Sequence, residues 1–237
     1  MTEDHYSLAV PFYDLWHEDG HVPMIRELLP PLLKGVTESV IEIGAGTGLI
    51  TRLIARETPA EIYAVEPSLG MRSVLVNRLA EDPDLLSRVT VLPCGALDVE
   101  VDEPVEAVVM ISVLHSFPPA EREELWRVLA RQLRPGGLLV FNRRERATPV
   151  PGEMEVMGSY RVGRHTYEIT GQVLAVADEA VKARYLYRIR QHGVVIEENE
   201  VISESHWVAR ERLDAELAAA GFARQDAPDG MEAWRLG

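Results

Sequence analysis

The chain has 237 residues, of which 46% are hydrophobic and 26% are charged, a balance that excludes a largely disordered protein. Because 24 Lys and Arg face 38 Asp and Glu, the formal net charge is −14, and nucleic acid is excluded as an expected partner. A single cysteine excludes an intrachain disulfide, and the amino-terminal residues lack a signal-peptide pattern. The longest apolar run, residues 107–114, falls far short of the ~20 residues of a membrane span. We therefore expect a cytoplasmic protein with no membrane partner.

After a first segment of residues 1–37, short runs rich in β-branched residues alternate with longer runs of helical periodicity. The predicted strands are residues 40–43, 62–65, 89–92, 105–112 and 138–141. The predicted helices are residues 49–57, a helix that Ser68 caps and that runs to Leu79, and residues 119–133, with a turn at 134–137. This alternation predicts an α/β fold with a Rossmann-like doubly wound, mostly parallel sheet, whose ligand site lies beyond the carboxyl ends of the strands.

Three glycines, Gly44, Gly46 and Gly48, follow the first predicted strand. Glycine has no Cβ, so its backbone adopts positive φ and lets a ligand come close to the main chain. The dinucleotide-binding fingerprint places its third glycine one residue later, where this chain has Leu49. The spacing therefore predicts a nucleotide-binding loop and argues against NAD.

Polar or small residues follow four of the predicted strands, namely Gly44, Glu66, Gly95 and Ser112. Parallel strands place their carboxyl ends at one edge of the sheet, so we expect these residues to converge on a single site.

The pattern changes after Asn142. Residues 154–201 alternate β-branched and aromatic residues around a His192-Gly193 turn, which predicts an antiparallel β elaboration. Residues 209–220 form a predicted helix that Gly221 ends, and Trp234 belongs to a predicted last short strand. We therefore divide the chain into four parts, residues 1–37, 38–145, 146–205 and 206–237.

Three motifs of this chain resemble those of the class I S-adenosylmethionine-dependent methyltransferases, both in sequence and in their separation. They are residues 41–48, Glu66 and residues 134–137. The resemblance covers about the first 142 residues. The remainder is similar, more loosely, to the β-rich part of bacterial small-molecule methyltransferases, including those that N-methylate amino sugars.

The resemblance implies S-adenosyl-L-methionine as cofactor, S-adenosyl-L-homocysteine as product, and no metal. It implies methyl transfer to a small-molecule acceptor, with an amine of a specialised metabolite as the first choice. An oxygen or carbon acceptor, a non-catalytic relative that binds the cofactor, and a dinucleotide-dependent oxidoreductase stay open as alternatives. Residues 38–145 would bind the cofactor, residues 146–205 would form an acceptor platform or a homodimer surface, and residues 206–237 would complete the core.

The resemblance also implies which residues bind the cofactor. Glu66 would accept hydrogen bonds from the ribose diol, and Glu42 would order the glycine loop or meet the cofactor's amino group. At Gly95-Ala96 the family often has an acidic residue that meets the adenine amino group, and here backbone groups or Asp98 would replace it. The full implied set is Tyr13, Glu42, Gly44, Ala45, Gly46, Gly48, Glu66, Pro67, Met71, Gly95, Ala96, Ser112 and Val113.

Alignment of donor and acceptor can supply most of the catalysis of methyl transfer, and a base matters only if the acceptor must lose a proton. His115, just after the fourth predicted strand, is the first candidate for that base, because neutral imidazole accepts a proton near pH 7; a structural role is the alternative. In the family a Tyr-Asp pair like Tyr13-Asp14 lies over the cofactor, so residues 1–37 are expected to form a helical lid. Tyr13 would face the sulfonium with its ring or hydroxyl.

Four residues of the β elaboration are candidates either for an acceptor pocket or for ordinary sheet packing. They are Tyr160, Tyr185, Tyr187 and His206.

Overall fold

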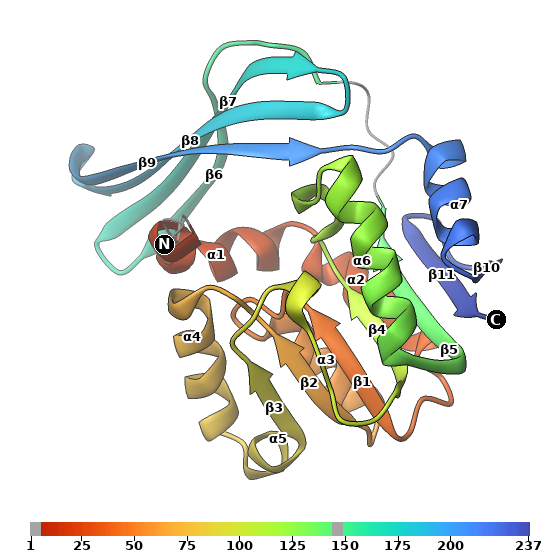
Figure 1. Cartoon of the computed structure of the whole chain (residues 1–237). Coiled ribbons are helices and arrows are strands. Elements are labelled where there is room, and N and C mark those ends of the chain that lie inside the picture. The colour runs from red at the N-terminus through yellow and green to blue at the C-terminus, as the bar shows by residue number, and fades with distance from the viewer. Residues whose placement is uncertain (1–5, 144–148) are drawn as a thin grey trace.

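The computed structural model describes residues 6–143 and 149–237 (Figure 1). The predicted boundary at 145/146 and the first five residues lie outside these ranges. The chain opens with two helices, α1 (Tyr6–Asp19) and α2 (Val22–Leu32). No helix in the described ranges is both long enough and apolar enough to cross a membrane.

A mixed sheet forms the centre of the molecule. Its strands are β1 (Ser39–Ile43), β2 (Glu61–Val65), β3 (Val89–Leu92), β4 (Val105–Met110), β5 (Leu133–Asn142), β10 (Phe222–Gln225) and β11 (Met231–Leu236). They lie in the order β10-β11-β5-β4-β1-β2-β3. Strands β1 to β5 are parallel, and β11 is antiparallel to both of its neighbours, β5 and β10. The predicted fold class, a doubly wound and mostly parallel sheet, is confirmed.

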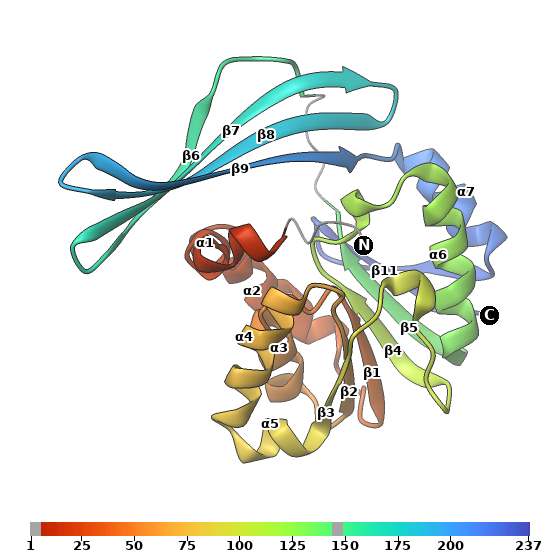
Figure 2. The ribbon, with the colours of Figure 1, turned by 60° about the vertical axis from the view of Figure 1, so that its left-hand side comes forward.

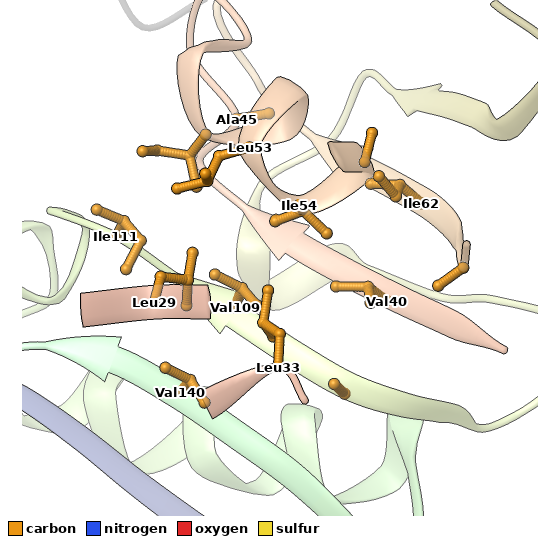
Figure 3. Packing of buried hydrophobic residues seen from close by; sticks show 14 of the residues in the cluster. Leu29, Leu33, Val40, Ala45, Leu53, Ile54, Ile62, Val109, Ile111 and Val140 are labelled. Atoms are coloured by element: carbon orange, nitrogen blue, oxygen red, sulfur yellow. The ribbon is translucent and has the colours of Figure 1, made fainter. Parts of the chain in front are cut away.

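Helices cover both faces of this sheet. They are α3 (Leu49–Glu57), α4 (Leu69–Ala80), α5 (Pro83–Arg88), α6 (Pro119–Gln132) and α7 (Arg210–Ala219), with short 3₁₀ turns η1 (Ala96–Asp98) and η2 (Leu114–Ser116). Successive strand residues point to opposite faces. Val40 therefore packs under α2 and α3 in one buried cluster, part of which Figure 3 shows, while Ile41 packs under α6 and α7 in the other.

Local signals place most of these helices where the sequence predicts them. Ser68 caps α4, since its hydroxyl accepts a hydrogen bond from the amide of Met71 at 3.3 Å. The short helix α5 was not predicted, although Asp82 caps it and Pro83 begins it. Six residues are too few to show a periodic apolar stripe.

The predicted turn at residues 134–137 lies within β5. Leu133 already pairs with Val105, and the next registered pair is Ala107 with Leu138, so the intervening residues bulge out of the ladder. Gly136 has a φ of +75°, which suits the bulge. The strand therefore begins before the turn signal, and the prediction misplaced its start.

The second sheet is an antiparallel meander of β6 (Glu155–Val162), β7 (His165–Ala177), β8 (Ala180–Gln191) and β9 (Val194–His206). The predicted turn at His192-Gly193 joins β8 to β9, and both of its residues have positive φ. The antiparallel elaboration is confirmed, and its last strand runs five residues beyond the predicted end.

Helix α1 lies between the two sheets (Figures 1 and 2). On one side, the ring of Phe12 packs against Tyr167 and Tyr187, with centroids 5.1 and 5.2 Å apart. The other side of α1 contacts α4 and the glycine loop. The opposite face of the second sheet carries charged side chains, where Arg188 pairs with Glu198 at 2.6 Å.

A buried ion-pair cluster joins the second sheet to the core. Arg122 of α6 is 1% exposed and donates to both carboxylate oxygens of Glu216 in α7, at 2.7 and 2.8 Å. The same guanidinium donates at 3.2 Å to Glu179, which lies in the β7–β8 turn. These contacts fix one end of the meander against the helices that cover the central sheet.

Candidate active site

The carboxyl ends of the parallel strands meet at one edge of the central sheet. Ile43 is in register with Val65 of β2 and with Met110 of β4. The amides of Gly44 and Ala45 both donate to the carbonyl of Val65, at 2.9 and 3.0 Å. The chain therefore turns across the end of β2 as soon as β1 finishes, which places the glycine loop at the predicted edge.

All three loop glycines have positive φ, +71° at Gly44, +59° at Gly46 and +88° at Gly48. A Cβ on Gly44 would lie under 3.0 Å from a methyl of Val113, and one on Gly48 equally close to Leu75. At Gly46 the nearest atom would be the hydroxyl of Tyr13, at 3.3 Å. Packing within the protein thus requires glycine at residues 44 and 48, whereas Gly46 faces the side chain of Tyr13 in α1.

Glu66 ties this loop to the start of α4. It is 7% exposed, and its carboxylate accepts a hydrogen bond from the amide of Gly46 at 2.9 Å and another from Ser68 at 2.8 Å. Each bond uses a different carboxylate oxygen, and each oxygen has a second lone pair. The side chain therefore ties the loop to the start of α4 and places a carboxylate acceptor at this edge of the sheet.

Glu42 is the most deeply buried acid of the site, at 2% exposure. Its Oε2 atom and the hydroxyl of nearby Thr51 have no hydrogen-bond partner among the described residues. Burial raises the pKa of Glu42 to about 8. The nearby Thr51 hydroxyl acts against this rise, and the carboxylate of Glu66 adds a smaller contribution to it. A buried carboxylate without a partner is costly, so this oxygen is suited to a cationic or hydrogen-bond-donating ligand.

Aromatic and imidazole rings of α1 cover the loop. The ring of Tyr13 lies 4.1 Å from that of His17, and His17 Nδ1 lies 3.1 Å from Nδ1 of His21. Burial raises the pKa of Tyr13 well above its usual value, and negative charge at Glu66 adds to the effect. Tyr13 therefore stays neutral at physiological pH and offers a hydroxyl and a ring face rather than a charge.

A hydrogen-bond latch holds α1 on the loop. The hydroxyl of Thr47 donates to Asp14 at 2.5 Å, and Arg78 of α4 forms an ion pair with the same carboxylate. Arg78 also donates to the carbonyl of Thr47 at 2.8 Å. The Tyr-Asp pair draws attention to Asp14 in the sequence, but no local signal identifies Arg78, which comes from a helix 64 residues away.

The segment after β4 forms the far wall of the site. Ser112 has a φ of +58°, and its amide donates to the side chain of Asn142 at 2.5 Å. This contact from the end of β5 stabilises a left-handed conformation that is unfavourable for a residue with a Cβ. Val113 packs on Gly44, whereas His115 lies exposed on η2, the turn that contacts β9.

The remaining predicted cofactor residues lie along the same edge of the sheet. Met71 is buried in the first turn of α4, and Pro67 is exposed just before that helix. Gly95 precedes η1, which begins at buried Ala96 and ends at exposed Asp98. Backbone groups of Gly95 and Ala96 and the carboxylate of Asp98 therefore stay the predicted adenine-side contacts.

The four candidates for an acceptor pocket do not lie together. Tyr160, Tyr185 and Tyr187 belong to the face of the second sheet that packs toward α1. His206 pairs with Ala180 at the other end of β8, away from these tyrosines. Tyr187 is buried against Phe12, so its position is that of a packing residue.

Comparison with known proteins identifies the class of this fold. Residues 40–137 match the family model of a methyltransferase domain. An uncharacterized methyltransferase from Anoxybacillus flavithermus is 32% identical over 133 residues, and the match covers 52% of this chain and 58% of that protein. The chain thus spans little more than half of this curated relative.

Two solved structures resemble nearly the whole chain. The sugar N-methyltransferase KedS8 from Streptoalloteichus has a TM-score of 0.73 at 18% identity, covering 94% of this chain and 92% of its own. CalS10, an amino pentose methyltransferase from Micromonospora echinaspora with SAM bound, has a TM-score of 0.72 at 16% identity and the same coverage of both chains. Residues 40–137 therefore match a methyltransferase domain, as the sequence resemblance predicts, and the chain has the fold of KedS8 and CalS10.

Proposed function

We propose that this protein transfers a methyl group from S-adenosyl-L-methionine to a small-molecule acceptor, with an amine as the preferred class. The observation that carries the proposal is the glycine loop held by Glu66 at the carboxyl edge of the sheet. The methyltransferase domain match and the SAM-bound structure of CalS10 support the choice of cofactor. The sugar N-methyltransferase title of KedS8 supports the choice of an amine.

The residues present fit this cofactor. Glu66 places a carboxylate acceptor at the end of β2, to which the ribose hydroxyls would donate. Oε2 of Glu42 is buried with no hydrogen-bond partner among the described residues, which suits a donor such as the ammonium group. Gly46 lacks a Cβ on the side that faces Tyr13, so a shift of the Tyr13 side chain would let a ligand come close to the backbone there. When bound, the cofactor supplies an electrophilic methyl group on a positively charged sulfur.

The protein's own contribution is then alignment and exclusion of water. The latch between Asp14 and Thr47 keeps α1 over the loop, and Tyr13 presents a neutral ring or hydroxyl to the sulfonium. His115 is the proposed base, because it is exposed beside β9, on the side where an acceptor would enter under the second sheet. It would take a proton from an ammonium or hydroxyl acceptor.

The test has two steps, with ligand-stripped protein. Calorimetry should first detect binding of S-adenosyl-L-homocysteine, and Glu66→Ala should weaken it at least tenfold, since hydrogen bonds to a charged group contribute about 1.5–3 kcal/mol. Incubation with methyl-labelled cofactor and amino sugars should then give a labelled product. Absence of binding would refute the proposal, and binding without any labelled product would indicate a non-catalytic relative.

A further inference from the structure

A pocket lies at the edge of the central sheet opposite the glycine loop. The parallel strands β1, β4 and β5 begin at this edge, and the residues that line the pocket come from the end of α2, the first residues of β4 and β5, and β11. Its volume is about 250 Å³, whereas the cavity beside Glu42 and the glycine loop has about 20 Å³. The pocket therefore has room for several water molecules or for a small ligand.

The charge of the pocket wall differs from that of the whole chain. The formal net charge of the chain is −14, yet the described residues of the wall include three cations, Lys34, Arg134 and Arg235, beside the carboxylate of Glu106. When Glu38, which pairs with Arg134, is also counted, these five side chains still carry one net positive charge. A local positive potential on an acidic protein suits the pocket to an anion.

The carboxylate in the wall is already engaged. Oε2 of Glu106 accepts hydrogen bonds from the amides of Thr37 and Glu38, at 2.7 and 2.9 Å. Arg134 donates to Oε1 at 2.6 Å. Burial alone would raise the pKa of this carboxyl, but the two amide hydrogen bonds and the charges of Arg134 and Arg235 outweigh it and hold the pKa below its usual value. Glu106 therefore orders the wall and fixes Arg134, and its own charge is compensated within the protein.

The other two cations keep donors that the protein does not use. Arg235 donates through Nη1 to the carbonyl of Gly136 at 2.7 Å, which uses one of the five N–H groups of a guanidinium. Lys34 makes no hydrogen bond or ion pair with any residue in the described ranges. Both side chains are exposed and line the same pocket. A planar guanidinium and an ammonium are the groups with which proteins bind carboxylate and phosphate.

The rest of the wall offers apolar surface. Leu32, Val36 and Leu138 line the pocket, and the last two are each only 6% exposed. Gly35 and Gly136 also line it, and no described atom lies within 4 Å of the place where a Cβ would stand on either glycine. The pocket thus combines cations for an anionic group with open space and apolar side chains for the body of a ligand.

We propose that this pocket binds a small organic anion, whose carboxylate or phosphate group contacts Arg235 and Lys34 and whose apolar part lies against the leucine and valine side chains of the wall. The pocket and the glycine loop lie at opposite edges of the sheet, so this inference does not depend on the proposed function.

The test uses nuclear magnetic resonance of the isotope-labelled protein, titrated with benzoate and with phenyl phosphate. The amide resonances of Gly35 and Gly136 should shift in a saturable way with at least one probe, and the probe with the higher affinity identifies the anionic group. The resonances of the glycine-loop residues 44–48 should not change. Benzyl alcohol, which has the ring but no charge, should shift neither Gly35 nor Gly136.

Substitutions then assign the contacts. Arg235→Gln should weaken the preferred probe about tenfold, because it removes a hydrogen bond between two charged groups. Lys34→Gln should weaken it roughly threefold, since an exposed ammonium is screened by water. Lys182→Gln, at an exposed residue of β8, is the matched control and should leave the affinity unchanged.

Three results would overturn the inference. They are the absence of saturable shifts with both probes, shifts at the glycine loop in place of the pocket, and equal affinity in the wild-type and Arg235→Gln proteins. None of them bears on binding of S-adenosyl-L-homocysteine, which tests the proposed function separately.

Discussion

Removing the guanidinium of Arg122 should destabilise the whole protein. The side chain is 1% exposed and makes two short hydrogen bonds to Glu216, so Arg122→Met leaves a carboxylate that is 7% exposed with part of its compensation lost. Breaking a buried ion pair costs about 3–5 kcal/mol. Because Arg212 and Trp126 still donate to Glu216, at 3.0 and 3.2 Å, we expect the lower end, about 3 kcal/mol.

Urea unfolding at pH 7, followed by circular dichroism, measures this loss. Arg127→Met on the same helix is the matched control, since Arg127 is 55% exposed and its pair with Glu124 is worth at most about 1 kcal/mol. Burial by itself would raise the pKa of Glu216, but hydrogen bonds from Arg122 and Trp126 outweigh it and hold the pKa below its usual value. The stabilisation is therefore present above the unfolded pKa and is lost as pH falls below it, so the penalty of Arg122→Met should shrink in acid. A loss below about 1 kcal/mol at pH 7 would refute this account of the cluster.

Three further substitutions test the site. Gly44→Ala places a methyl group against Val113 at a residue with positive φ, whereas Gly136→Ala has positive φ but open space around the methyl. Urea unfolding should show losses in the free energy of unfolding of roughly 3 and 1 kcal/mol, respectively. Equal losses would contradict the packing argument. Glu42→Gln should make the free energy of unfolding less dependent on pH. The pKa of Glu42 is raised to about 8 in the folded protein, so its contribution to stability is full below the pKa of the unfolded chain and is lost as pH rises through 8. The same pH dependence of stability in both proteins would count against this. Asp14→Ala should break the latch and speed proteolysis within α1 several-fold, and an unchanged cleavage rate would show that the latch is dispensable.

Most of the central sheet could be predicted because its signals are local. The buried strands β1 and β4 read as continuous apolar runs, and caps such as Ser68 mark where helices begin. The errors occur where pairing overrides local signals. Strand β5 pairs with β4 both before and after residues 134–137. This pairing holds a sequence that favours a turn within a strand.

The candidate site was predictable only in part, for a related reason. The glycine loop and Glu66 both follow predicted strands, so their place at the edge of the sheet follows from the predicted fold. Arg78 and Asn142 act by reaching across the tertiary structure, to Asp14 and Ser112 respectively, and nothing in their own neighbourhood shows it. Spacing therefore identifies the backbone that cradles a ligand but misses the side chains that hold that backbone in place.

Helix α1 contacts both the glycine loop and the second sheet. One side of the helix is latched to the glycine loop through Asp14, and the other is packed through Phe12 on the tyrosines of the second sheet. The helix cannot move away from the loop without also disturbing its aromatic contacts with β7 and β8. Because the cavity beside Glu42 has room for only about one water molecule, entry of an amino-acid tail requires such a movement. We therefore expect entry of the tail to disturb the aromatic contacts between α1 and the second sheet as well.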